Sequence, residues 1–98
     1  MSGNSIIYPL EFTEEAIKKV LDLGAKKYSP NGWIDGIKFD PKSNAKSMIG
    51  HYLAMLGGEE IDPDSGLPHY YNFITRAAME LHCRKYGLAG FPKMKYKD

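Results

Sequence analysis

The stretch from His51 to Arg76, HYLAMLGGEEIDPDSGLPHYYNFITR, constrains the fold of this chain more than any other. One apolar-periodic segment ends at Gly57 and Gly58, and another begins after Pro68, which predicts two helices joined by a short loop. Helices with a short connection pack antiparallel. We therefore expect the loop at one end of a helical pair, with one histidine before it and another after it.

That loop is strongly acidic, since four carboxylates fall within six positions: Glu59, Glu60, Asp62 and Asp64. Like charges this close are tolerated when they are solvated, when one takes up a proton, or when a cation lies among them. A solvated turn and a cation site both fit the charges. The flanking histidines, His51 and His69, favour the cation site, because the fold can bring both imidazoles towards the loop.

The whole chain predicts one all-α domain, residues 1–98, in the form of a small three-helix bundle. Residues 1–12 are expected to be an extended arm, residues 13–87 the helical core, and residues 88–98 a lysine-rich tail anchored by Phe91 and Tyr96. Thr13 is the expected N-cap of the first helix and Asn44 that of the second. Residues 29–43 are expected to form an ordered loop, because large apolar side chains recur through them.

The third helix has two distinct stripes. Its apolar stripe consists of Tyr70, Phe73, Ile74, Ala77 and Leu81, and its polar stripe of His69, Asn72, Arg76 and Glu80. Three amphipathic helices of this length make a thin core. We therefore expect oligomerisation, to a homodimer or a larger assembly, to complete the bundle.

The composition excludes several functional classes. The chain has 43% hydrophobic and 26% charged residues with a net charge of +1, so no overall field favours nucleic acid or an acidic membrane. The single cysteine, Cys83, cannot form an internal disulfide, and no leader or membrane-spanning run is found. The expected location is the cytoplasm.

Two polar sets are compatible with a nucleotide. Carboxylates with one or two imidazoles hold Mg²⁺ or Mn²⁺, which suits nucleotide hydrolysis with a carboxylate or His51 as base. Arg76 beside His69 and Asn72 is a phosphate-binding set, although Arg76 paired with Glu80 on a solvated face fits equally well. Further phosphate and base contacts are predicted, with a role in the core as the alternative, for Lys26, Lys27, Tyr28, Asn31 and Trp33.

Three segments together resemble a family of small phage proteins described as dATP/dGTP diphosphohydrolases. They are LGAKKYSPNGW (residues 23–33), residues 36–39, and above all HYLAMLGGEEIDPDSGLPH (residues 51–69). The resemblance implies metal-dependent hydrolysis of a purine deoxynucleoside triphosphate in the host cytoplasm during infection. The matching positions imply catalytic roles for His51, Asp62 and Asp64, metal binding by Glu59, Asp62 and Asp64, and ligand binding by His51 and His69.

The chain also departs from that family at three places. Gly50 precedes His51 where an arginine is usual, and Asn72 and Arg76 stand where a histidine and an asparagine are usual. Losing an imidazole and gaining a guanidinium favours holding phosphate over hydrolysing it. Our first hypothesis is therefore sequestration, without a required cofactor, of a purine nucleotide or a nucleotide-derived immune signal, such as a cyclic ADP-ribose type or a cyclic oligonucleotide, as counter-defence. The alternative is Mg²⁺- or Mn²⁺-dependent diphosphohydrolysis.

Overall fold

The computed structural model describes residues 5–27, 29–35 and 38–96, which form three α-helices. Helix α1 spans Glu11–Lys27, α2 spans Pro41–Leu56 and α3 spans His69–Tyr86. A short 3-10 helix, η1, spans Gly32–Asp35. Within the described residues the only β geometry is an isolated bridge between Ile61 and Pro68. The predicted all-α fold is confirmed.

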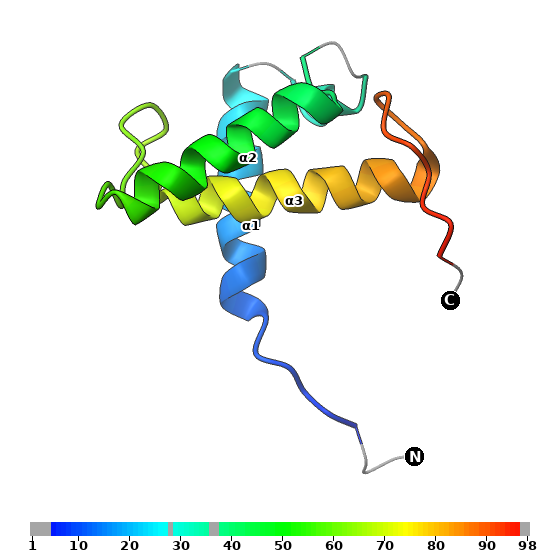
Figure 1. The fold of residues 1–98 in the computed structure, drawn as a ribbon. Coiled ribbons are helices and arrows are strands. Elements are labelled where there is room, and N and C mark those ends of the chain that lie inside the picture. Colours follow the sequence, from blue (N-terminus) through cyan, green and yellow to red (C-terminus); the bar gives the residue numbers. More distant parts are fainter. Residues whose placement is uncertain (1–4, 28, 36–37, 97–98) are drawn as a thin grey trace.

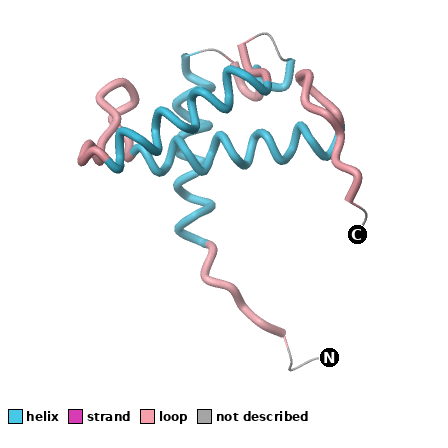
Figure 2. The backbone as a smooth tube through the Cα atoms, in the orientation of Figure 1, coloured by secondary structure: helices cyan, strands magenta, loops and turns pink. Residues whose placement is uncertain are grey.

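Helices α2 and α3 lie side by side and antiparallel, with the acidic loop joining them at one end (Figure 1). Helix α1 crosses this pair steeply, and its N-terminal half projects away from the pair together with residues 5–10 (Figure 2). Residues 5–10 are extended and exposed, as predicted for the arm. Helix α1 begins at Glu11, two residues before the N-cap predicted at Thr13. None of the described helices is long and apolar enough to cross a membrane.

The prediction of Asn44 as the N-cap of α2 is wrong. The cap is Asp40, whose carboxylate accepts a hydrogen bond from the Ser43 backbone N–H at 2.8 Å, and Pro41 occupies the first turn. The Ser43 hydroxyl accepts in return from the Asp40 backbone N–H at 3.2 Å, which completes a capping box. Asn44 therefore lies one turn inside the helix, where its side chain is fully buried.

The seam between α2 and α3 is polar. The Asn44 amide donates to the Arg76 carbonyl at 3.2 Å and to the Glu80 carboxylate at 2.9 Å, so it ties α2 to α3. Thr75 is also fully buried, and its hydroxyl donates to the Tyr71 carbonyl. Buried polar groups must be hydrogen-bonded. The seam thus depends on specific bonds between named partners as well as on apolar contact.

The two stripes predicted for α3 exist, but the most deeply buried members belong to the polar stripe and the most exposed ones to the apolar stripe. His69 and Asn72 of the polar stripe are buried. Tyr70 and Leu81 of the apolar stripe are 53% and 58% exposed. Sequence periodicity identified the faces of the helix correctly, whereas the packing decides which face lies inside.

A compact apolar core lies at the C-terminal end of α3. Phe39, Cys83 and Phe91 are buried there, and four partly buried apolar residues pack against them: Trp33, Met79, Leu88 and Ala89. The loop after α1 is therefore ordered over its described part, as expected; Gly36 and Ile37 lie outside the described residues. Phe91 anchors the tail as predicted, whereas Tyr96 is 78% exposed and does not.

Candidate metal centre

The acidic loop is folded tightly around the side chain of Asp62. Its carboxylate accepts from the Asp64 backbone N–H at 2.9 Å and from the Ser65 hydroxyl at 3.3 Å. The backbone of Asp62 bonds across the loop as well, its N–H donating to the Leu67 carbonyl and its carbonyl accepting from the Gly66 N–H. A turn in which Asp binds the N–H two residues on orients the carboxylate. Asp62 is therefore held in place by the loop itself.

Asp62 forms a cluster with the two histidines, one from each of the paired helices. One ligand atom from each of His51, Asp62 and His69 lies within 4.8 Å of the others, a grouping that could hold a metal ion. The Nδ1 atoms of His51 and His69 lie only 2.8 Å apart. His69 is almost completely buried, and the other two side chains are partly exposed. The cluster is therefore partly accessible to solvent.

Glu59 fixes the tautomer of a neutral His69. Its carboxylate lies 2.8 Å from His69 Nε2, so the proton of a neutral His69 is held at Nε2. The Nδ1 atom of His69 then accepts a hydrogen bond from the Nδ1–H of His51 at 2.8 Å. A carboxylate behind a histidine in this way is the usual outer partner of a metal-ligating imidazole. Glu59 was predicted to bind metal directly, whereas it lies behind His69.

The surroundings of His51 favour its neutral form. Burial lowers the pKa of His51, and the nearby His69 and Arg76 lower it further, while Asp62 acts in the opposite direction. A neutral imidazole is the form that binds a cation. The lowered pKa therefore suits a metal ligand at neutral pH.

This shift predicts how stability depends on pH. Because the pKa of His51 is lower in the folded chain than its ordinary value of 6.5, the unfolded chain binds more protons at mildly acidic pH. The contribution to stability is complete above pH 6.5 and is lost as the pH falls through the folded-state pKa. In EDTA-treated protein, we expect the Tm to fall more steeply with acidification in wild type than in His51→Asn, as measured by circular dichroism.

The control for this measurement is His82→Asn, which removes the exposed histidine of α3 and leaves the cluster intact. This variant should keep the wild-type pH dependence. Equal acid sensitivity of wild type and His51→Asn contradicts the assignment.

Sequence comparison supplies the family. The family model described as dATP/dGTP diphosphohydrolase, N-terminal, matches residues 6–89 of the 98-residue chain. The chain belongs to this family. No curated protein and no solved structure matches it. The resemblance seen in residues 23–33, 36–39 and 51–69 is thereby confirmed at the level of the family.

In this member of the diphosphohydrolase family, two further residues support the cluster of His51, Asp62 and His69. The Asn72 amide, which is largely buried, donates to the Ser65 hydroxyl at 3.1 Å. Ser65 in turn donates to the Asp62 carboxylate. Asn72 was predicted to bind phosphate, but its amide is occupied in holding the loop. Ser65 was not singled out in the sequence, although its place in the DPDSG turn is typical of side chains that bond to a loop.

The other loop carboxylates lie outside the cluster. Asp64 and Glu60 are exposed, and among the described residues the group that could hold a metal ion takes only Asp62 from the acidic loop. The predicted metal set of Glu59, Asp62 and Asp64 therefore shares one member with the observed group. Asp64 stays a predicted catalytic residue.

Arg76 lies between the cluster and the apolar core. Its guanidinium stands 5.8 Å from the centroid of the Phe39 ring, and after burial and the neighbouring His69 its charge also lowers the pKa of His51. Glu80, the alternative partner considered for Arg76, accepts from Asn44 and from Arg84. Phosphate binding by Arg76 stays a prediction.

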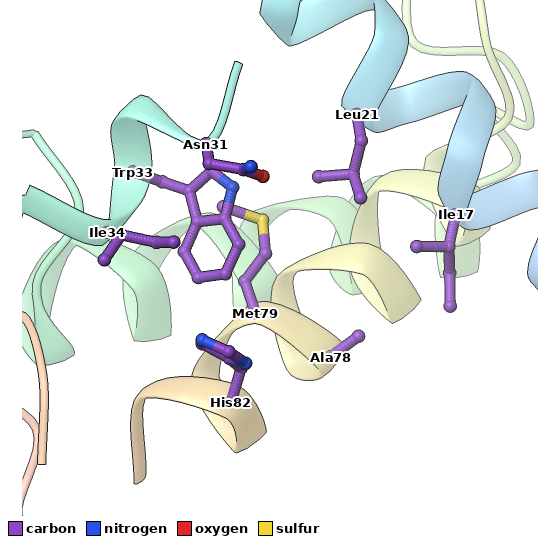
Figure 3. A pocket seen from close by; sticks show the side chains of 8 residues that line it. All are labelled: Ile17, Leu21, Asn31, Trp33, Ile34, Ala78, Met79 and His82. Carbon is purple, nitrogen blue, oxygen red and sulfur yellow. The ribbon is translucent and has the colours of Figure 1, made fainter. Parts of the chain in front are cut away.

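The remaining predicted ligand residues gather elsewhere. Asn31, Trp33 and His82 line a cavity of about 330 Å³ (Figure 3). The centroids of the Trp33 and His82 rings lie 5.6 Å apart. His82 is thirteen residues from His69 on the same helix, a separation of about 20 Å at 1.5 Å per residue. Lys26 and Lys27 are exposed at the end of α1, and Tyr28 lies outside the described residues. Asn31 and Trp33 therefore lie apart from the cluster, and Lys26 and Lys27 belong neither to the cluster nor to this cavity.

Proposed function

We propose that this protein hydrolyses a purine deoxynucleoside triphosphate at the cluster of His51, Asp62 and His69, with a divalent cation bound there. The observation that carries the proposal is the approach of the three ligand atoms to within 4.8 Å of one another. Membership of the dATP/dGTP diphosphohydrolase family supports the substrate class.

Three features support cation binding at this donor set. The Nδ1 atoms of His51 and His69 share one proton at 2.8 Å, which a cation would displace, His69 is backed by Glu59, and the Asp62 carboxylate is oriented by its loop. Three protein donors leave coordination positions for water and substrate. Two imidazoles with one carboxylate suit Mn²⁺ or another transition metal better than Mg²⁺, which prefers oxygen ligands.

The hydrolysis proposal assigns a role to each residue around the cluster. A divalent cation supplies Lewis-acid polarisation of the phosphate. Glu59 keeps the proton of His69 on Nε2, and Ser65 with Asn72 keeps the Asp62 carboxylate aimed at the histidines. Arg76 binds phosphate oxygens through its guanidinium, which matches their geometry bidentately. Asp64, exposed and two residues from Asp62, accepts the proton of the attacking water.

One observation favours a second function, the sequestration of a nucleotide without hydrolysis. Burial is the main cause of the lowered pKa of His51, and the positive charge of Arg76 contributes to it in the same direction. A fixed cation beside the cluster opposes a metal ion and favours an anionic ligand. Sequestration of a purine nucleotide, or of a cyclic nucleotide signal of host immunity, is therefore the competing proposal.

A single experiment separates the two functions. The purified protein is incubated with dATP, dGTP and cyclic purine nucleotides, with Mn²⁺, with Mg²⁺ and with EDTA, and the nucleotides are then released by heat and separated by chromatography. We expect dATP or dGTP to be converted to the monophosphate only when a divalent cation is present, with faster turnover in Mn²⁺.

The opposite outcome is equally clear. If a nucleotide is retained and released unchanged under all three conditions, sequestration replaces hydrolysis, and Arg76→Ala should then abolish retention. If no nucleotide is converted or retained, both proposals fail. Heat-released nucleotide from Arg76→Lys serves as the matched control, because lysine keeps the charge and loses the bidentate geometry.

A further inference from the structure

Helix α2 presents an apolar stripe to solvent beside its contact with α3. Ile49, Leu53 and Leu56 are 59%, 60% and 65% exposed, and Tyr52 is 40% exposed. Ala45, Ile49, Tyr52 and Leu56 follow one another at intervals of four, three and four residues. This is the spacing by which one helix packs against another in a coiled coil or a helical bundle.

The exposed apolar surface of α2 continues onto the face of α3 that contacts neither α1 nor α2. Two faces of α3 are already occupied, one by α2 through His69 and one by α1, where the rings of Phe12 and Tyr71 meet at 5.9 Å. The remaining face carries the exposed Tyr70 and Leu81. Both belong to the apolar stripe predicted for α3, whose other members, Phe73, Ile74 and Ala77, are half-buried.

The two exposed stripes form one continuous patch. The ring of Phe73 on α3 lies 5.4 Å from that of Tyr52 on α2 and 5.9 Å from that of Tyr70. Between the helices is a groove of about 410 Å³, lined mostly by apolar side chains that include Met48 and Ile49. We call this surface the α2/α3 face. Large contiguous apolar patches are rare on monomeric proteins and mark sites of association.

We infer that the α2/α3 face is the contact surface between two copies of this chain, which pair it with itself to form a four-helix bundle. An antiparallel helical pair with one apolar side is half of such a bundle. A two-fold interface joins the same patch on both subunits. No Asp, Glu, Lys or Arg occurs from Met48 to Leu56, and the net charge of +1 offers little repulsion between copies.

The composition of the interior also points to a second copy. The buried apolar residues of the described chain are Ala16, Phe39, Cys83 and Phe91, and the last three gather at one end of α3. Small domains bury too small a fraction of their surface to be comfortably stable alone. Pairing of the α2/α3 face would supply a second apolar core along the middle of the helices, where the seam within one chain is polar.

The interface leaves the metal centre open. His51 faces α3 and lies outside the stripe, and the acidic loop lies beyond the end of the helices. Association and cation binding are therefore independent in this proposal.

The test is the mass of the full chain in solution by analytical ultracentrifugation at micromolar concentration. We expect wild type to sediment at twice the 11.0 kDa of one chain. Leu53→Glu and Leu81→Glu, on α2 and α3, each place charge in the paired face and should sediment as monomers. Circular dichroism is recorded for each variant, and retained helicity is expected because both side chains are exposed.

The matched control is Ile7→Glu, which makes the same kind of change at a 91% exposed position in the arm. It should remain dimeric. A monomeric wild type overturns the inference. A dimer that withstands both Glu substitutions on the α2/α3 face also overturns it, and loss of the dimer in Ile7→Glu alone assigns the contact to the arm instead.

Discussion

Asp62→Asn is expected to weaken Mn²⁺ binding by about 100-fold or more and to reduce hydrolysis of dATP and dGTP at least in proportion. Asp62 is the only carboxylate in the described cluster, and the two imidazoles supply no negative charge. Asn has nearly the same shape and can still accept the Asp64 N–H, so the loop should keep its fold. Mn²⁺ affinity is measured by isothermal titration calorimetry, alongside turnover and the Tm of the metal-free variant.

Asp64→Asn is the matched control for this prediction. It removes the same charge from the same loop, but Asp64 is exposed and lies outside the cluster. It should leave Mn²⁺ affinity almost unchanged, while turnover falls if Asp64 accepts the proton of water.

Glu59→Gln should weaken Mn²⁺ binding about 10-fold, an effect between those of Asp62→Asn and Asp64→Asn, because the amide still accepts from His69 but no longer carries charge. Wild-type Mn²⁺ affinity in Asp62→Asn contradicts the assigned centre.

Asn44→Leu is expected to lower the free energy of unfolding by about 2–3 kcal/mol. Leu branches at the same atom as Asn but is larger, so no empty space is created and overpacking of the fully buried site adds to the loss. The rest of the loss comes from the two acceptors on α3, the Glu80 carboxylate and the Arg76 carbonyl, which lose a donor at the seam. Small domains are stable by about 5–15 kcal/mol. The change is therefore a substantial fraction of the total, and urea denaturation followed by circular dichroism measures it.

Lys46→Leu, two residues further along α2, is the control for this effect. Its side chain is exposed, and surface changes of this kind usually alter stability by no more than about 0.5 kcal/mol. The denaturation slope should remain the same in both variants, which shows that the unfolded states are comparable. A loss below about 0.5 kcal/mol in Asn44→Leu means that the polar seam does not join the helices.

Helix boundaries were predictable only where the local signal was unambiguous. Gly57 and Gly58 end α2, and Pro68 immediately precedes α3, as the pattern indicated. The start of α2 was placed four residues late, because Pro41 was taken as a loop residue. Proline is equally suited to the first turn of a helix, and the Asp40 and Ser43 capping box removes the ambiguity.

The candidate site was predictable as a region and not as a set of contacts. His51, Asp62 and His69 were all selected from the sequence, and the structure brings them together. Which carboxylate reaches the histidines depends on the path of the loop backbone, which two left-handed glycines, Gly58 and Gly66, help to define. Sequence spacing along a loop carries no such information, so Glu59 and Asp64 could not be separated from Asp62 in advance.

The sequence by itself determined the helical class, the antiparallel pairing of α2 and α3, and the residues from which the site is drawn. Periodicity, glycines and prolines act within a few residues, so these features can be recognised locally. The tertiary structure alone decided that the polar stripe of α3 faces α2 and that Asn72 supports the loop through Ser65. Those outcomes depend on hydrogen-bond partners far apart in the chain, such as Asn44 with Glu80, and no local pattern specifies which distant groups will meet.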